Sequence, residues 1–339
     1  MSTIYYDDDA DPSTISGLKI SFVGYGNQGR SQALNLRDSG LDVLVGNIED
    51  EYATQAREDG FEVLPISEAA AHGDLVMMLI PDEIMPGVFV EQVAPALEPG
   101  NLLDFASGYN IAFDLIDPPA GVDVVLIAPR MIGPGVRDTY VSGEGFPSFV
   151  SVHRDATGTA EARMVALAHA MGSTRAGCIA MSMHDEATLD LFTEQAFGPA
   201  FGNVLLSAVT TLVDAGYPPE AVLLELILSG EFEYTFAKIR EVGMLEQMEY
   251  HSTTSQYGSL SRGVKFAELI GPLMERMNGV LGEIRSGEFS REWSGDRENK
   301  LRELADLKAL RDQIPFTDWE RRARRAFRVG KSDGGEAKD

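Results

Sequence analysis

Short apolar runs alternate with amphipathic stretches through the first half of the chain. The runs are four to six residues long, as in buried β-strands, and they cover residues 18–23, 41–45, 75–80, 102–105, 122–127 and 149–152. Helical periodicity lies between some of them, for example at residues 30–39 and 67–72. Strands that alternate with helices predict βαβ units and a parallel sheet.

The pattern changes to helical periodicity after about residue 180. Apolar residues recur at helical spacing over residues 184–215, 219–228, 231–242, 264–286 and 297–312, with Gly and Pro residues between some of these stretches. We therefore expect an α/β Rossmann domain over residues 1–182 and an all-α domain over residues 183–329. The polar segment 330–339 is predicted to be disordered.

A glycine-rich motif directly follows the first predicted strand. It reads GYGNQG and consists of Gly24, Tyr25, Gly26, Asn27, Gln28 and Gly29. Between a strand and a helix, the first glycine permits a tight turn and the second lets the backbone approach a pyrophosphate. The third glycine allows the helix and the strand to pack closely, and the helix N-terminus faces the phosphates. The motif therefore predicts a dinucleotide site.

The loop after the second predicted strand is where the adenosine ribose of a dinucleotide is expected. It reads Asn47-Ile48-Glu49-Asp50-Glu51. A 2′-phosphate needs Arg, Lys or Ser partners, and two like charges in contact repel by up to about 4 kcal/mol at an effective dielectric constant of about 20. We therefore predict that NADH is preferred over NADPH. Glu49 or Asp50 is expected on the ribose, with Asn47 beside them.

The chain is strongly acidic, because 53 Asp and Glu against 28 Lys and Arg give a net charge of −25 over 339 residues. This charge argues against binding to nucleic acid or to an anionic membrane surface. We expect no transmembrane helix and no secretion signal, because no sufficiently long apolar run is present, and we expect a cytoplasmic protein. Cys178 is the single cysteine, which excludes an internal disulfide.

Several longer stretches are similar to one enzyme family. They include YYDDDAD, VGYGNQGRSQALNLRDSG, TLDLFTEQ, LVDAGYPPEAVLLEL and IRSGEFSREW. With these stretches the chain, from Tyr5 to about Trp319, resembles ketol-acid reductoisomerase in its short form. The resemblance implies a Rossmann domain and a knotted all-α domain. It also implies a homodimer whose helical domains intertwine and complete each other's active sites, and it is compatible with a higher assembly.

The resemblance further implies a reaction in two steps on a small-molecule substrate. Two Mg²⁺ ions hold a 2-hydroxy-2-alkyl-3-keto acid during an alkyl migration, and the nicotinamide then reduces the new keto group. Asp190 and Glu194 match one pair of metal ligands, and their spacing of four places both on one helix face. In the second pair, which the partner subunit supplies, Glu225 is retained but Ser229 replaces a glutamate. Mg²⁺ is therefore expected with one site weakened.

Further departures fall on residues that handle protons in the family. Ser107, which is expected beside the cofactor, stands in place of a histidine, and Arg130 stands in place of a lysine. Because arginine does not release its proton at neutral pH, Arg130 is expected to clamp the substrate carboxylate. Ser252 matches a substrate-binding serine, and Asp82 matches a position near the nicotinamide. His251 is the histidine best placed to supply a proton in place of the missing groups.

These departures leave three functions open. The favoured one is an NADH-dependent reductase that transfers a hydride to a keto acid, ketone or imine, with isomerisation weakened or lost. Pro199, which is expected to kink the long helix and move the wall of the substrate pocket, also favours it. The second is a true ketol-acid reductoisomerase with altered ligands. The third is a non-catalytic protein that binds a dinucleotide, which is disfavoured because Asp190, Glu194, Glu225 and Ser252 are retained.

Overall fold

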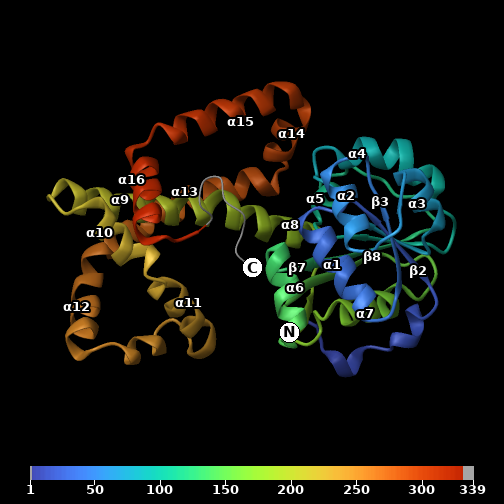
Figure 1. Cartoon of the computed structure of the whole chain (residues 1–339), viewed down its shortest axis with the longest axis horizontal. Helices are drawn as coiled ribbons and strands as arrows, with labels where there is room; N and C mark the ends of the chain where they lie inside the picture. The colour runs from blue at the N-terminus through green and yellow to red at the C-terminus, as the bar shows by residue number, and fades with distance from the viewer. Residues whose placement is uncertain (1, 331–339) are drawn as a thin grey trace. The chain divides into compact units, whose positions relative to one another are not determined.

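A nine-stranded sheet positions the predicted cofactor residues. The computed structural model describes residues 2–330, and the chain divides into two compact units, Met1–Asp190 and Leu191–Asp339 (Figure 1). The strand order is β1-β9-β8-β7-β6-β5-β2-β3-β4. The strands are β1 (Ile4–Tyr5), β2 (Lys19–Val23), β3 (Asp42–Gly46), β4 (Val63–Leu64), β5 (Leu75–Met78), β6 (Leu102–Phe105), β7 (Asp123–Pro129), β8 (Ser148–Arg154) and β9 (Cys178–Ala180). The predicted disordered segment lies outside the described residues except for Gly330.

The sheet is mixed, so the prediction of a parallel sheet is only partly right. Strands β4, β3, β2, β5, β6 and β7 are parallel, whereas β8 is antiparallel to β7 and β1 is antiparallel to β9. Helix α6 (Gly133–Ser142) lies between β7 and β8, and after it the chain returns to the end of β7, where the backbone N–H of Arg130 donates to the carbonyl oxygen of Pro147 at 2.9 Å. Gly133 packs so tightly on the glycine turn that a Cβ there would lie 2.3 Å from the carbonyl oxygen of Asn27. The chain is thus held at the edge where β7 ends, and Ser148 pairs with Pro129.

Apolar side chains cover both faces of this sheet. Successive strand residues point to opposite faces, so Phe22 joins one buried cluster and Val23 the other. Burial on both faces explains why the strands read as continuous apolar runs. The first face packs against α1 (Asn27–Asp38) and α7 (Ala160–Met171), and the second against α3 (Ile66–His72) and α4 (Met85–Val88). The unit also contains α2 (Glu51–Glu58), α5 (Tyr109–Ala112) and α8 (Met183–Phe192).

The second unit is all helical, as predicted. Its small buried cluster contains Val209, Val222, Leu223 and Ala323, while many large apolar side chains remain exposed. The knotted chain path stays a prediction. The α-helices are α9 (Gly198–Asp214), α10 (Pro219–Leu223), α11 (Glu231–Val242), α12 (Thr253–Gly263), α13 (Ile270–Arg285), α14 (Glu288–Gly295), α15 (Arg297–Asp312) and α16 (Pro315–Phe327), and η8 (Val264–Leu269) is a 3₁₀ segment.

One helix is long and apolar enough, by length and composition alone, to cross a membrane. It runs from Met183 to Asp214, and most of its apolar stretch is exposed in the single chain. The expectation that the chain has no transmembrane helix stays a prediction, and Thr, Ser, Asn and Gly residues interrupt the apolar runs of this helix. A single such helix is weak evidence for a membrane, since a core helix of a soluble protein meets the same criteria.

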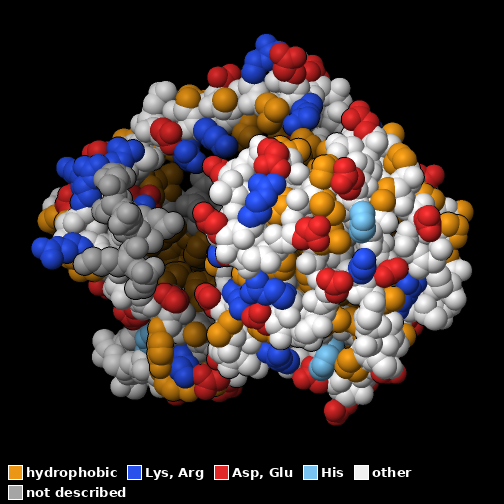
Figure 2. All heavy atoms as spheres, turned by 45° about the vertical axis from the view of Figure 1, so that its right-hand side comes forward, with side chains coloured by type: hydrophobic (Ala, Val, Ile, Leu, Met, Phe, Trp, Pro, Cys, Tyr) orange, Lys and Arg blue, Asp and Glu red, His pale blue; other side chains and the backbone are white. Residues whose placement is uncertain are grey.

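Charged side chains of both signs are interspersed on the face drawn in Figure 2. This face therefore does not show the continuous basic stripe that phosphate backbones require. The expectation that the chain binds neither nucleic acid nor an anionic membrane rests on its net charge of −25 and stays a prediction.

Candidate active site

The glycine turn between β2 and α1 has the geometry that a dinucleotide requires. Gly24 has a φ of +103°, and a Cβ there would lie 2.6 Å from the carbonyl oxygen of Leu79. A Cβ on Gly29 would lie 2.5 Å from the carbonyl oxygen of Gly24, so the helix can approach the strand only with glycine at this position. A Cβ on Gly26 would meet no atom within 4 Å. The space in front of the N-terminus of α1 is therefore open and fits a pyrophosphate.

Two side chains of this motif bind other parts of the protein. Tyr25 is buried, and its hydroxyl donates to a carboxylate oxygen of Asp59 at 2.9 Å. The side-chain nitrogen of Gln28 donates to the carbonyl oxygen of Met131 at 2.8 Å, which ties the turn to the loop after β7. The predicted cofactor contacts of Tyr25 and Gln28 are therefore left to their backbone N–H groups.

The acidic loop after β3 is internally bonded. Asp50 caps α2 by accepting from the backbone N–H of Ala53 at 2.9 Å, and Asn47 donates to the same oxygen at 2.8 Å. Glu49 accepts from both Nη atoms of Arg57, at 3.0 and 2.5 Å, and this ion pair lowers the pKa of Glu49. Sequence reasoning missed Arg57, which α2 brings back to the loop. The loop thus carries three carboxylates and one guanidinium.

The residues predicted to lie near the nicotinamide follow β5 and β6. Asn110 is buried and its side-chain nitrogen donates to Asp82 at 2.9 Å. The hydroxyl of Ser107 accepts from the backbone N–H of Tyr109 at 3.3 Å, so it is oriented by the first turn of α5. Because β5 and β6 are parallel neighbours, their carboxyl ends lie at the same sheet edge as the glycine turn.

Arg130 lies at the carboxyl end of β7 and forms ion pairs with two carboxylates. Its Nη1 donates to Asp190 at 2.7 Å and its Nη2 donates to Glu186 at 2.8 Å. Its Nε donates to the carbonyl oxygen of Ala128 at 3.2 Å, and its Cζ lies 4.7 Å from the ring centroid of Phe149. Arg130 thus binds carboxylates of its own chain, whereas the sequence predicted a clamp on the substrate.

Glu186 is a site residue that sequence reasoning missed. Its side chain is fully buried, and its Oε2 accepts from the backbone N–H of Gly108 at 2.7 Å. Burial raises the pKa of Glu186 to about 7, although the hydrogen bond from Gly108 and the charge of Arg130 oppose the rise. Glu186, Asp190 and Glu194 follow one another at intervals of four, and this regular spacing was the signal available in the sequence.

Two of the predicted metal ligands lie in π-helical turns. Glu194 is in the turn Thr193–Phe197, and Glu225 is in the turn Leu224–Leu228, directly before Ser229. Single π turns inside α-helices are frequent at functional sites. The helix continues through Pro199, where a kink was expected. The backbone N–H of Gly198 donates to the carbonyl oxygen of Thr193, so the π turn joins directly to α9.

The residues described for this chain do not fit a centre with two magnesium ions. Asp190 matches the ligand that would bridge both ions, and its Oδ1 is bound to Arg130. Among residues 2–330, no group of three or more His, Cys, Asp or Glu side chains is arranged to hold a metal ion.

Ser252 caps α12 by accepting from the backbone N–H of Ser255, and His251 contacts Gln247 at 3.2 Å.

A Rossmann-type unit with an intact dinucleotide turn, followed by an all-helical unit, defines a class of NAD(P)-dependent oxidoreductases. Residues 14–177 match the profile described as "Acetohydroxy acid isomeroreductase, NADPH-binding domain", and residues 183–328 match "Ketol-acid reductoisomerase, C-terminal domain". The chain belongs to the ketol-acid reductoisomerase family and is an NAD(P)H-dependent oxidoreductase.

Relatives of known name support this assignment over the whole chain. "Ketol-acid reductoisomerase (NADP(+))" from Methanopyrus kandleri is 44% identical over 318 residues, which cover 93% of this chain and 94% of that protein. "Putative ketol-acid reductoisomerase 3" from Saccharolobus solfataricus is 41% identical over 290 residues, covering 84% and 86%. The solved structure of an NADH-preferring ketol-acid reductoisomerase from an uncultured archaeon superposes with a TM-score of 0.90 at 32% identity, covering 95% of this chain and 98% of that one.

Replacement of Gly26 by alanine is expected to weaken NADH binding and to leave the fold intact. The φ of Gly26 is −72°, which any residue adopts, and the added methyl group meets no protein atom within 4 Å. The methyl group would instead occupy the space of the pyrophosphate. Fluorescence titration should show a Kd for NADH that rises at least about tenfold, or about 1.4 kcal/mol, with an unchanged Tm.

Gly87→Ala is the matched control for this substitution. Gly87 is an exposed glycine of α4 whose added Cβ would likewise meet no atom within 4 Å. This variant should change neither the Kd nor the Tm. A Gly26→Ala variant that bound NADH as tightly as the wild type would contradict the assigned pyrophosphate site.

Proposed function

We propose that this chain is an NADH-preferring reductase of the ketol-acid reductoisomerase family that transfers a hydride to a small keto acid, with isomerisation weakened or lost. The observation that carries the proposal is the contrast, along one edge of the sheet, between the residues that bind the cofactor and those that would handle protons. The glycine turn keeps every feature of a dinucleotide site, with Gly24, Gly26 and Gly29 in their required geometry. At the same edge, Ser107 and Arg130 occupy the positions of the family's histidine and lysine.

The residues of this edge support reduction better than migration. NADH, when bound, supplies a hydride that together with a proton from water converts a carbonyl group to a hydroxyl group. The turn at α1 holds the pyrophosphate, and Asn110 orients Asp82 near the nicotinamide. Alkyl migration also needs a group that exchanges protons at neutral pH, which the Arg130 guanidinium cannot do. Ketones and imines are alternative acceptors for the same hydride.

A true ketol-acid reductoisomerase is the second candidate. It is favoured by the names of relatives at 44% and 41% identity, which extend over most of the chain. In this alternative, Glu194 and Glu225 would still bind Mg²⁺ and Ser229 would leave one site weakened. The non-catalytic alternative has no comparable support, because the relatives named above carry the names of enzymes.

The preference for NADH rests on the loop after β3. Glu49, Asp50 and Glu51 present three carboxylates where a 2′-phosphate would lie, and Arg57 is occupied by Glu49. One similar protein of solved structure is described as NADH-preferring, whereas one relative is named for NADP(+). The family therefore includes proteins named for either cofactor, and the charges of this loop support NADH in the present chain.

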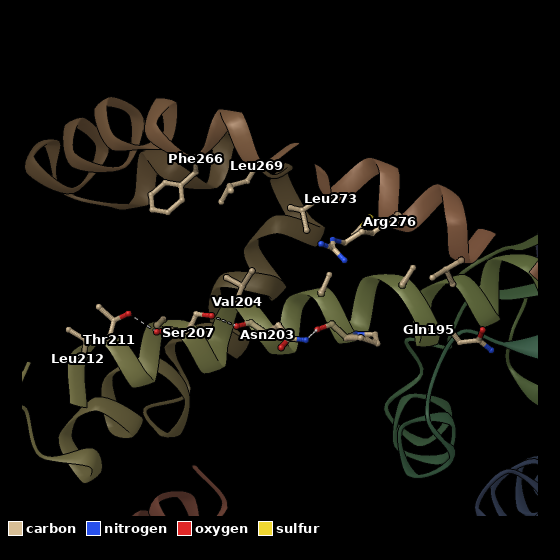
Figure 3. Close-up of a pocket in the computed structure, with 16 residues that line it drawn as sticks. Gln195, Asn203, Val204, Ser207, Thr211, Leu212, Phe266, Leu269, Leu273 and Arg276 are labelled. Atoms are coloured by element: carbon tan, nitrogen blue, oxygen red, sulfur yellow. Dashed lines mark hydrogen bonds between the residues drawn. The ribbon is translucent and has the colours of Figure 1, made fainter. Parts of the chain in front are cut away.

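We also propose a homodimer with shared active sites. A groove of about 950 Å³ runs along α9 and is closed on the other side by η8 and α13 (Figure 3). Asn203, Ser207 and Thr211 donate to carbonyl oxygens four residues earlier, so this face of α9 offers mostly apolar surface. Val204 and Phe266 are 61% and 65% exposed there. A second copy would cover this face, and a higher assembly and a cytoplasmic location also stay predictions.

Two substrates separate hydride transfer from isomerisation. Acetolactate must isomerise before it is reduced, whereas 3-hydroxy-3-methyl-2-oxobutanoate needs only the hydride. We expect NADH oxidation with the second substrate and a rate at least about 100-fold lower with the first, in the presence of Mg²⁺, because Ser107 and Arg130 cannot relay the proton. Comparable turnover of both would establish a true reductoisomerase, and turnover of neither would contradict the proposed keto-acid substrate.

Replacement of Glu49 by glutamine is expected to bring NADPH affinity closer to NADH affinity. The substitution removes one negative charge and releases Arg57 to meet a 2′-phosphate. The ratio of the two Kd values, measured by fluorescence titration, should change by about tenfold in favour of NADPH. Glu58→Gln removes the same charge from an exposed position of α2 and should change the ratio little. Wild-type protein that bound NADPH as tightly as NADH would contradict the predicted preference.

Val204→Glu is expected to separate the proposed dimer. Sedimentation equilibrium should give at least twice 36.8 kDa for the wild type and 36.8 kDa for the variant, because a carboxylate would be buried in the mostly apolar groove. The variant should still bind NADH but lose reductase activity. Val141→Glu, at a position 67% exposed on α6, is the control and should stay dimeric. A monomeric wild type would exclude shared active sites.

A further inference from the structure

We propose that the guanidinium of Arg130 is a built-in cation that takes the place of one of the two divalent ions implied by the family, so that Asp190 is not a metal ligand in this chain. The inference rests on the proposed function and deepens it, because it assigns the positive charge beside the reducible carbonyl to the protein. A centre with two Mg²⁺ ions would need the Asp190 carboxylate as a ligand, whereas Asp190 is bound to Arg130 in this chain.

Arg130 is held by four contacts. Its three donating nitrogens reach Asp190 at 2.7 Å, Glu186 at 2.8 Å and the carbonyl oxygen of Ala128 at 3.2 Å. The ring of Phe149 lies under the guanidinium at 4.7 Å. The side chain of Arg130 is 24% exposed, which leaves part of it open to a ligand. A cation fixed in this way needs little reorganisation to act on a bound oxygen.

Glu186 explains why Arg130 points toward the helix of Asp190. Its side chain is fully buried, and its other oxygen is fixed by the backbone N–H of Gly108 at 2.7 Å. A Cβ on Gly108 would lie 2.9 Å from that oxygen and 2.4 Å from the carbonyl oxygen of Met183, so glycine is required for this approach. Glu186 therefore anchors one arm of the guanidinium, and the other arm falls on Asp190.

Arginine and lysine would act differently at position 130. Arginine presents a planar fork that can bind two carboxylates at once, whereas lysine offers a single flexible ammonium group. Arginine also keeps its charge at any pH at which the protein is folded. A metal ion on Asp190 would lie beside this permanent positive charge and would be repelled by it. Arg130 is in this sense a positioning residue that neutralises Asp190 and excludes a metal from it.

The number and affinity of bound metal ions test this inference without turnover. Mn²⁺ binding to the full-length protein is measured by electron paramagnetic resonance, as a spectroscopic substitute for Mg²⁺. We expect the wild type to bind at most one Mn²⁺ per subunit, and Asp190→Asn to bind it equally well. Arg130→Lys should bind Mn²⁺ at least about tenfold more tightly, because lysine releases one of the two carboxylates. The Kd for NADH should be the same in all three proteins.

Arg137→Lys is the matched control. Arg137 also bridges two acceptors, Asn35 at 2.9 Å and Asp38 at 2.5 Å, and both lie on α1 rather than on the helix of Glu186 and Asp190. This variant should leave Mn²⁺ binding unchanged. If Arg130→Lys does not fold, Asp190→Asn decides the question, because a loss of Mn²⁺ binding in that variant would make Asp190 a metal ligand and overturn the inference.

Two further outcomes separate this inference from the proposed function. Two Mn²⁺ ions bound per subunit in the wild type would overturn the inference, even if the protein reduced 3-hydroxy-3-methyl-2-oxobutanoate as proposed. Wild-type binding of at most one Mn²⁺, with unchanged binding in Asp190→Asn, would support the inference even if neither keto acid were reduced. In that case the proposed function alone would fail.

Discussion

The ion pairs of Arg130 with Glu186 and Asp190 join the end of β7 to the helix that carries the predicted metal ligands. Glu186 is fully buried, so its charge depends on a fixed cation nearby. Removing one partner from a buried ion pair typically costs about 3–5 kcal/mol, because the other charge is left without compensation. The same contact therefore holds α8 against the sheet and determines which charges are available to a substrate.

The two halves of the candidate site are under different structural constraints. The glycine turn retains a geometry that forbids any other residue at Gly24 and Gly29, and this constraint comes from the backbone atoms of Leu79 and Gly24. The metal half has no such constraint, because its residues are side chains that can be exchanged one at a time. We propose that Arg130 and Ser107 are two such exchanges. Family membership is thus compatible with chemistry that differs from that of the named relatives.

The sequence predicted the two fold classes and most of the large elements, but not the contacts that define the site. Helices α11 and α15 begin and end where periodicity placed them, because their apolar spacing is regular. Strands β1, β4 and β9 were missed, since two or three residues carry no periodic signal, and the pairing of β1 with β9 joins Ile4 to Ile179. The ion pairs of Arg57 with Glu49 and of Arg130 with Glu186 likewise depend on tertiary packing, which no local pattern encodes.

The most direct measurement is a crystal structure of the protein grown with NADH and Mn²⁺, in which anomalous scattering locates each manganese ion. We predict that Arg130 stays within hydrogen-bond distance of both Glu186 and Asp190, with the dinucleotide at the N-terminus of α1 and at most one manganese ion in each site. Two manganese ions bridged by Asp190, with the Arg130 guanidinium displaced from that carboxylate, would contradict the central claim.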